Sequence, residues 1–227
     1  LIIINALFFL ARYTLASTLN IDLNSFLGLY YYNSPEFNPY QLISYMFMHG
    51  GFSHIFFNMF ALWMFGTQIE NLWGPKRFLN YYLITGFGAA FLHYLIIHFQ
   101  ISGLESYFTS NQISEIVNSG AFNPSSPLFS KARMLYGLHH TPVVGASGAV
   151  FGLLLAYGMT YPNQIIYLNL LFPIKAKYFV VIYGLLEFFM GVQNGARDNV
   201  AHFAHIGGML FGFLLIKYWK KNDMNFY

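Results

Sequence analysis

One serine in this 227-residue chain stands where a nucleophile would be useful. Ser147 lies between Gly145 and Gly148, at the start of an apolar stretch that runs from Ala149 to Tyr161. Small neighbours let a substrate approach the backbone closely, and the first turn of a helix offers unpaired N–H groups to a developing negative charge. The segment therefore predicts a serine nucleophile at the mouth of an apolar helix.

The base that would activate this serine is predicted to be His205, since histidine titrates near neutral pH. It precedes the stretch Gly208–Gly212, which repeats the small-residue spacing of Gly148–Gly152. Such spacing lets apolar helices pack closely, and close packing here would bring His205 to Ser147. His202 lies one helical turn earlier on the same face. A polar contact between helices is the alternative reading for His205, and His202 is expected nearer the loop and water, without a direct role.

His54 and Asn58 are spaced to lie on one face of a helix, and both side chains can donate hydrogen bonds. With the Ser147 backbone N–H they could hold the oxyanion of a tetrahedral intermediate, where each donor is typically worth about 3–4 kcal/mol. A plain hydrogen bond between helices is the alternative. His49 is off that face, and we expect it to orient the preceding loop.

No acidic residue has an evident place beside His205. Asp198 falls in the neighbouring connection, and Glu187 falls in the middle of an apolar span. The simpler prediction is a dyad of Ser147 and His205, without a third member.

The composition places these residues in a membrane protein. Apolar residues make up 56% of the chain and charged residues only 8%, whereas soluble domains carry roughly 25% charged residues. The net charge of +3 comes without any basic run longer than two residues, so a nucleic-acid partner is not expected. There is no cysteine and hence no disulfide.

Stretches of largely apolar residues predict an all-α, polytopic membrane protein with a six-helix bundle in a single domain, residues 1–227. The fourth span is too short to cross a hydrocarbon core of about 30 Å, so Ser147 should lie at the floor of a cavity open to one side. The loop 100–144 is expected to hold one short helix near 128–137. Because the chain starts inside an apolar run, we expect a preceding segment to be missing. The six spans are about 1–19, 52–70, 77–99, 147–161, 175–193 and 202–219.

The basic residues of alternate loops fix an orientation by the positive-inside rule. Seven lie on one side and three on the other, which predicts a cytoplasmic C-terminus and an active site open to the outer side, in a bacterial cytoplasmic (inner) membrane. The seven are Lys76, Arg77, Lys175, Lys177, Lys217, Lys220 and Lys221, and the three are Lys131, Arg133 and Arg197.

Taken together, three segments between about residues 40 and 219 resemble the rhomboid family of intramembrane serine proteases. The resemblance implies a serine endopeptidase with Ser147 as nucleophile and His205 as general base and acid. It implies transmembrane protein substrates, cut near the membrane boundary, and no metal or cofactor. The matching segments are His49-x4-His54-x3-Asn58, Gly145-x-Ser147-Gly148 and Ala204-His205-x-x-Gly208-x-x-x-Gly212.

The chain departs from this family at Phe151, where many members carry a tyrosine stacked on the catalytic histidine. Phenylalanine keeps the ring and loses the hydroxyl group. Three other readings stay open: an inactive rhomboid-like protein that binds membrane clients, a histidine-rich metal or haem membrane protein, and a transporter. The sequence leaves the substrate and the oligomeric state undetermined.

Overall fold

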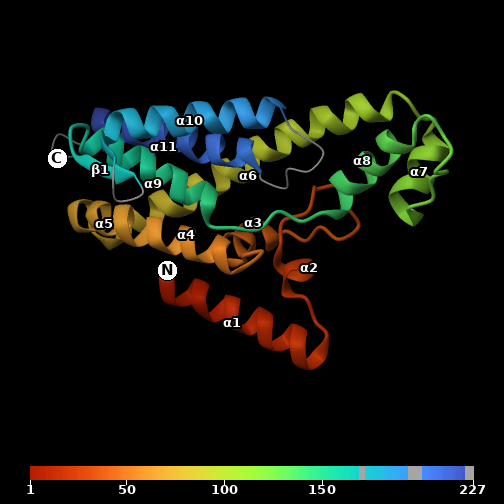
Figure 1. The fold of residues 1–227 in the computed structure, drawn as a ribbon, viewed down its shortest axis with the longest axis horizontal. Helices are drawn as coiled ribbons and strands as arrows, with labels where there is room; N and C mark the ends of the chain where they lie inside the picture. Colours follow the sequence, from red (N-terminus) through yellow and green to blue (C-terminus); the bar gives the residue numbers. More distant parts are fainter. Residues whose placement is uncertain (169–171, 194–200, 223–227) are drawn as a thin grey trace.

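The computed structural model of the protein describes residues 1–168, 172–193 and 201–222 (Figure 1). This part of the chain is mostly helical and contains one two-stranded antiparallel hairpin. The elements in chain order are α1 (Ile2–Leu19), α2 (Leu23–Leu27), α3 (Gln41–Ser44), a 3-10 turn (Tyr45–Phe47), α4 (Phe52–Ala61), a π-helical turn (Leu62–Gly66), α5 (Thr67–Trp73), α6 (Pro75–Glu105), α7 (Ser110–Ser119), α8 (Phe129–His140), α9 (Ser147–Thr160), β1 (Ile165–Leu168), β2 (Phe172–Lys175), α10 (Ala176–Gln193) and α11 (His202–Asn222).

Each of the six predicted apolar ranges is helical. Among the described residues, α1, α6 and α10 are long and apolar enough to cross a membrane, and α9 is a shorter apolar helix. The second range consists of α4, the π-helical turn and α5, which follow one another without a break. The described residues thus contain three helices that are both long and apolar enough to cross a membrane, and the count of six crossings stays a prediction.

Helices α6, α9 and α11 contact one another at the centre of the molecule. A Cβ atom at Gly208 of α11 would overlap the backbone of Gly148 on α9, so only glycine lets these two helices come so close. A Cβ atom at Gly152 would lie 2.7 Å from the Cβ of Thr85 on α6. The Tyr81 hydroxyl, also on α6, donates to the Gly152 carbonyl at 2.8 Å.

The small-residue stretches Gly148–Gly152 of α9 and Gly208–Gly212 of α11 contact each other at one end only. Gly148 packs on Gly208, whereas Gly152 and Gly212 both face α6, where a Cβ at Gly212 would lie 3.0 Å from Tyr81 Cζ. The contact nearest to Ser147 and His205 is therefore the tightest one. It sets the distance between the first turns of α9 and α11.

Helix α9 begins near the middle of the long axis of the molecule, and α6 continues past it toward α7 and α8 (Figure 1). With 14 residues, α9 is about 21 Å long at about 1.5 Å per residue. It is therefore shorter than a hydrocarbon core of about 30 Å. Ser147, its first residue, lies inside the bundle rather than at an end of it.

The segment 100–144 contains two helices where the sequence suggested one. The suggested helix near 128–137 corresponds to α8, and α7 precedes it. Helix α7 starts with a capping box in which Thr109 and Gln112 bond each other's backbone N–H groups. This Thr-x-x-Gln pattern is a recognisable helix start, so the sequence did contain the signal for α7.

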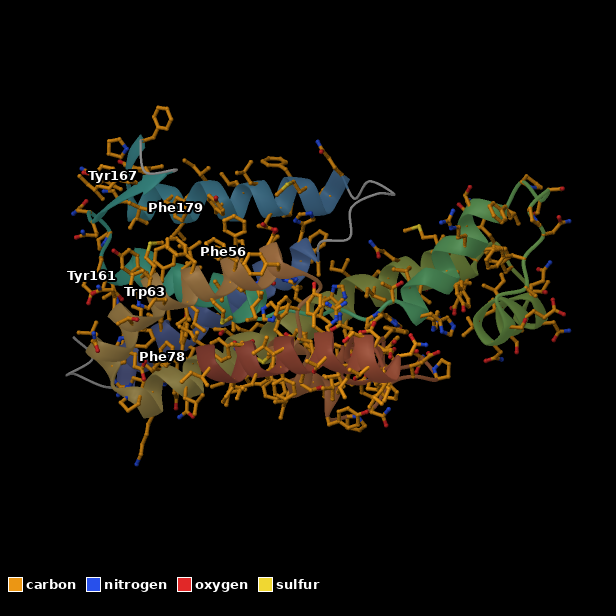
Figure 2. All side chains as sticks on the ribbon, turned by 60° about the horizontal axis from the view of Figure 1, so that its bottom comes forward. Phe56, Trp63, Phe78, Tyr161, Tyr167 and Phe179 are labelled. Atoms are coloured by element: carbon orange, nitrogen blue, oxygen red, sulfur yellow. The ribbon has the colours of Figure 1, made fainter. Side chains whose placement is uncertain are left out.

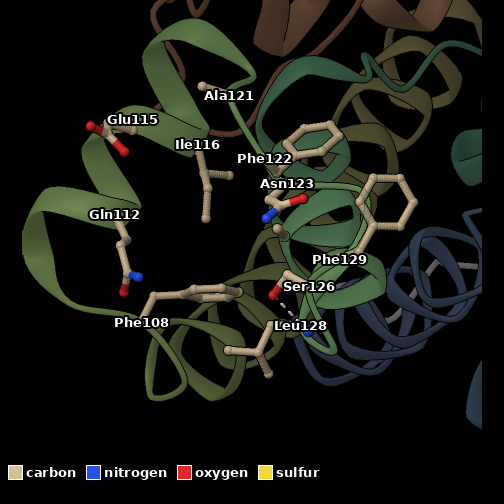
Figure 3. Close-up of a pocket in the computed structure, with 11 residues that line it drawn as sticks. Phe108, Gln112, Glu115, Ile116, Ala121, Phe122, Asn123, Ser126, Leu128 and Phe129 are labelled. Carbon is tan, nitrogen blue, oxygen red and sulfur yellow. Dashed lines mark hydrogen bonds between the residues drawn. The ribbon is translucent and has the colours of Figure 1, made fainter.

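Between α7 and α8 lies a cavity of about 210 Å³ (Figure 3). Apolar side chains from both helices and their connection line it, with Gln112 and Glu115 among its polar groups. All of its lining residues fall between Phe108 and Ala132, so the cavity is separate from Ser147 on α9.

The hairpin β1–β2 lies between α9 and α10. Ile166 pairs with Ile174 in an antiparallel register, and the Ile166 side chain is buried. The branched isoleucines of this segment suit a strand better than a loop. Tyr161, Tyr167 and Trp63 lie near the same end of the molecule (Figure 2), and tyrosine and tryptophan are the residues enriched at membrane–water interfaces.

Candidate active site

The backbone before α9 places Ser147 at the first helical position. Gly145, two residues earlier, has a φ angle of +139°, a region that L side chains rarely adopt. Its N–H donates to the Tyr45 carbonyl at 2.9 Å, which fixes the approach of the chain to the helix. A Cβ at Gly145 would lie 2.8 Å from His54 Nε2 and 3.4 Å from Ser147 Oγ. His54 and Ser147 therefore flank Gly145.

The structure brings Ser147 and His205 into direct contact. Ser147 Oγ lies 2.8 Å from His205 Nε2, within hydrogen-bond distance. The close packing of Gly148 on Gly208 accounts for this distance, because it holds α9 and α11 together beside both side chains. The His205 side chain is buried.

His205 is also held through its second ring nitrogen. Its Nδ1 lies 2.7 Å from Oε2 of Glu187, a buried residue of α10. The same oxygen lies 2.7 Å from His202 Nδ1. The sequence did not place Glu187 here, although a lone carboxylate in an apolar span is a signal of function by itself. Asp198, the other acid considered, lies outside the described residues.

The Phe151 ring stacks on the His205 ring, with centroids 4.3 Å apart and planes tilted by 6°. Phe151 lies one turn after Ser147 on α9, so one helix supplies both the serine and the stacking ring. Contacts to one face of the ring and to both ring nitrogens thus hold the His205 imidazole in place. No hydroxyl group is needed for the stacking.

His54 is oriented by the loop before α4. The Gly50 N–H donates to His54 Nδ1 at 3.3 Å. A neutral imidazole has one donor and one acceptor nitrogen, so this bond leaves the hydrogen on Nε2, the nitrogen nearest to Gly145. Asn58 donates one amide hydrogen to the His54 carbonyl at 2.9 Å and has a second hydrogen on the same nitrogen.

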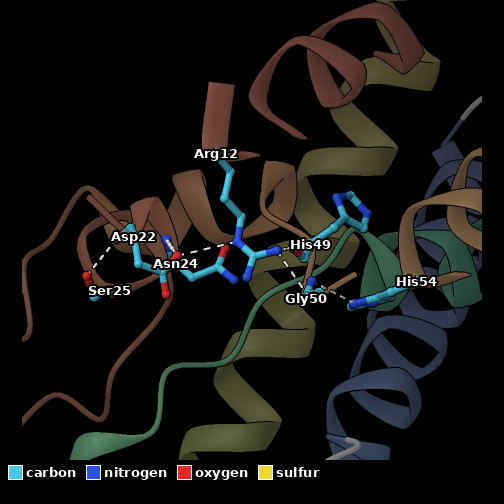
Figure 4. A network of polar contacts seen from close by, with 7 residues as sticks. All are labelled: Arg12, Asp22, Asn24, Ser25, His49, Gly50 and His54. Atoms are coloured by element: carbon cyan, nitrogen blue, oxygen red, sulfur yellow. Dashed lines mark hydrogen bonds and ion pairs between the residues drawn. The ribbon is translucent and has the colours of Figure 1, made fainter. Parts of the chain in front are cut away.

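Figure 4 shows the contacts behind this loop. Arg12, from α1, donates to the carbonyls of His49 and Gly50, both at 3.2 Å, and to Asp22 Oδ1 at 3.3 Å. The His49 ring is buried and lies edge-on to the His54 ring at 5.0 Å. The sequence gives no local signal for this contact, since Arg12 lies 37 and 38 positions before the two residues whose carbonyls it binds.

The carboxylate and imidazole groups of Glu187, His202 and His205 are also close enough to be considered as metal ligands, with ligand atoms within 4.8 Å of one another. The other histidine pair, His139–His140, is placed differently. His140 Nδ1 lies 2.9 Å from Glu36 Oε1 and its Nε2 lies 2.7 Å from the Val117 carbonyl, so its ring joins the loop before α3 to helix α7.

Comparison with known proteins gives the family. The Rhomboid domain matches residues 36–221. RHOMBOID-like protein 4 of Arabidopsis thaliana is 32% identical over 179 residues, covering 78% of this chain and 33% of the relative. RHOMBOID-like protein 12, mitochondrial, of the same plant is 30% identical over 171 residues, covering 74% and 43%. Rhomboid protease AarA of Providencia stuartii is 28% identical over 174 residues, covering 75% and 52%.

The chain thus spans between a third and about half the length of these relatives. The domain match covers α4 to α11 and includes every residue of the site described above except Arg12 and Asp22. The helical architecture and the domain match lead to the same conclusion: this chain belongs to the rhomboid family.

Proposed function

We propose that this protein is an intramembrane serine endopeptidase that cuts transmembrane segments of other membrane proteins near the outer membrane boundary. The observation that carries the proposal is the 2.8 Å contact between Ser147 Oγ and His205 Nε2 inside an apolar bundle. Serine becomes a nucleophile when an adjacent base can take its proton. The family membership supports the same reaction class, since one relative is named a rhomboid protease.

In the proposed reaction, Ser147 Oγ attacks the substrate carbonyl carbon while its proton passes to His205 Nε2, and the carbonyl electron pair moves to the oxygen. His54, Asn58 and the Ser147 N–H would donate to this oxyanion. Collapse breaks the C–N bond, and Nε2 gives its proton to the leaving amine. Water then attacks the acyl ester with the same proton transfers and releases Ser147 and a carboxylic acid. The scheme uses protein groups and water alone.

The proposed arrangement in the membrane has six crossings, a cytoplasmic C-terminus and a site open to the outer side. It is supported by the excess of lysine and arginine on one set of loops and by the start of α9 within the bundle (Figure 1). A bacterial inner membrane is proposed because Rhomboid protease AarA of Providencia stuartii is among the relatives. A substrate helix has its backbone hydrogen bonds satisfied internally, so it must unwind locally before Ser147 can attack.

The proposal is tested with a fluorophosphonate probe on detergent-purified protein, with mass spectrometry to locate the adduct. We expect labelling on Ser147, and a fall in labelling rate of about 10³-fold or more in both Ser147→Ala and His205→Ala, because removing either member of such a unit removes most of its activity. Ser114→Ala, an exposed serine on α7, is the matched control and should label like the wild type.

Absence of labelling in folded wild-type protein would overturn the proposal. It would favour an inactive family member that binds membrane clients. Labelling that persists at the same rate in His205→Ala would also contradict it, because the serine would then not depend on this histidine.

A further inference from the structure

We propose that Glu187 is a positioning residue that holds His205 in the tautomer and orientation needed for catalysis, so that Ser147, His205 and Glu187 act as a three-residue unit. This inference rests on the proposed function. It differs from the dyad that the sequence suggested, and it assigns a role to a side chain of α10.

The geometry links three helices in one chain of hydrogen bonds. Ser147 Oγ on α9 lies 2.8 Å from His205 Nε2, and His205 Nδ1 on α11 lies 2.7 Å from Glu187 Oε2 on α10. An ionised carboxylate only accepts hydrogen bonds, so the hydrogen of a neutral His205 ring lies on Nδ1. Nε2 then has a free lone pair for the serine hydroxyl, as a general base requires.

The surroundings of Glu187 support an ionised, hydrogen-bonded carboxylate. Its side chain is buried, although most of the large side chains around it on α10 are exposed and apolar. Burying a charge is costly unless it is paired and hydrogen-bonded, and here two imidazole Nδ1 atoms lie 2.7 Å from one oxygen. His202 thus has a place beside Glu187 as the second donor to the carboxylate.

Besides orienting His205, Glu187 has a second effect through its negative charge. When His205 takes the serine proton it becomes an imidazolium, and the neighbouring carboxylate makes the pair neutral overall. Attraction between opposite charges is strong where water is scarce, so the transition state gains more from Glu187 than the resting enzyme does. Besides Glu187, the titratable groups that interact with His205 include three histidines: His202 on α11, His54 on α4 and His93 on α6.

A metal ion on Glu187, His202 and His205 is the competing explanation for the cluster. Tetrahedral zinc with bonds of about 2.0–2.1 Å keeps its ligand atoms about 3.3 Å apart. Both nitrogen–oxygen distances here are 2.7 Å, which are hydrogen-bond distances.

The test compares wild type with Glu187→Gln and Glu187→Asp, using a single-span reporter protein in detergent micelles and measuring kcat and KM across pH. We expect Glu187→Gln to lower kcat by about 10²- to 10⁴-fold with little change in KM, since the wrong tautomer becomes accessible. Glu187→Asp should recover part of kcat, because it restores the charge. Glu115→Gln, the same change at an exposed site of α7, should behave as wild type.

The pH profile separates positioning from a structural role. In Glu187→Gln the ascending limb of kcat/KM should move to lower pH, because the imidazolium has lost its carboxylate partner. A folded Glu187→Gln variant with wild-type kcat and an unmoved limb would overturn the inference. Equal losses in both variants with an unmoved limb would overturn it too, as would stoichiometric zinc that is present in wild type and lost in Glu187→Gln.

These outcomes are distinct from a failure of the proposed function. Wild-type protein that neither cleaves the reporter nor reacts with fluorophosphonate overturns the protease assignment, whatever Glu187 does. Active wild type with an equally active, folded Glu187→Gln variant overturns only the role of Glu187.

Discussion

Gly145 determines both the backbone conformation before α9 and the space beside Ser147 and His54. Its positive φ angle turns the chain into α9, and its missing side chain leaves room for both His54 Nε2 and Ser147 Oγ. In the proposed reaction, a substrate carbonyl attacked by Ser147 would have to come close to both groups. Glycine is therefore required here for conformation and for space together.

The first prediction concerns Gly145→Ala. The new methyl group would lie 2.8 Å from His54 Nε2, and the backbone would have to hold a conformation that costs an L residue about 1–3 kcal/mol. We expect the thermal transition to fall and the rate of fluorophosphonate labelling to drop by at least about tenfold, the equivalent of about 1.4 kcal/mol.

Gly103→Ala is the control for this experiment. Gly103 lies within α6, and a Cβ there would meet nothing within 4 Å. Alanine is favoured over glycine in a helix by about 1 kcal/mol, so this variant should be as stable as wild type or slightly more so. Equal behaviour of the two variants would contradict the role given to Gly145.

The sequence was sufficient to predict that Ser147 and His205 lie together, because a serine among glycines and a histidine before a small-residue stretch are local patterns, and the two side chains are 2.8 Å apart. It was not sufficient to predict that Glu187 lies beside His205. Which face of α10 turns inward depends on how α10 packs against α9 and α11, and nearly uniform apolarity along α10 carries no periodic signal for that face. The charge of Glu187 was visible, but its partner was not.

At the scale of elements, the Arg12 side chain links α1 to the loop before α4. The described α1 has a single fully buried residue, Asn5, and its Arg12 binds the two carbonyls before α4 (Figure 4). Gly50, one of these two residues, donates its N–H to His54. Hydrogen bonds thus link Arg12 of α1, through the peptide unit between His49 and Gly50, to His54, a proposed oxyanion donor.

The second prediction is that Arg12→Met lowers kcat by about tenfold, the effect of losing about 1–2 kcal/mol of charge-assisted hydrogen bonding that orients this loop. KM should change less than kcat, because Arg12 contacts the loop and not the scissile bond. Steady-state cleavage of the reporter measures both constants. Arg133→Met, on the exposed surface of α8, is the control, and a matching loss there would argue against a specific effect of Arg12.

Some helices and strands were also easier to predict from the sequence than others. Long apolar runs were enough to locate α1, α6, α9, α10 and α11, since burial in lipid requires such runs. Helix α7 and the β1–β2 hairpin were missed because both are short and polar or mixed in composition. For α7 the capping pattern was present in the sequence, whereas the hairpin depends on a pairing between two strands.

At the scale of the whole molecule, one contact joins segments 104 residues apart. Glu36 lies 2.9 Å from His140 Nδ1 at the end of α8, and the Ser34 hydroxyl donates to its other oxygen at 2.6 Å. Burial acts to raise the pKa of Glu36, but the hydrogen bonds from Ser34 and His140 outweigh it and hold this pKa below its usual 4.5.

The third prediction follows from the direction of this shift. A carboxyl group with a lowered pKa in the folded state stabilises the fold above its usual pKa, and the stabilisation is lost as pH falls through the lowered value. Wild type should therefore melt at a higher temperature than Glu36→Gln above pH 4.5, and the difference should shrink below that pH. Since Glu36 is partly exposed, the expected effect is that of a surface pair, about 0.2–1 kcal/mol.

Thermal melts across pH measure this effect. Glu115→Gln serves again as the control, because it removes an exposed carboxylate from the neighbouring helix α7. A constant difference between wild type and Glu36→Gln down to acid pH would show that the stabilisation does not come from the ionised group.

The length of α6 has a practical consequence. Its 31 residues extend about 46 Å at about 1.5 Å per residue, more than a hydrocarbon core of about 30 Å. Its final turns carry α7 and α8 beyond the start of α9 (Figure 1), and a buried cluster that includes Ile97, Ile101, Ile116 and Leu135 fixes them there. A 26.1 kDa chain is small for single-particle imaging, and this projection offers an epitope where an antibody fragment could add mass without touching the helices that carry Ser147 and His205.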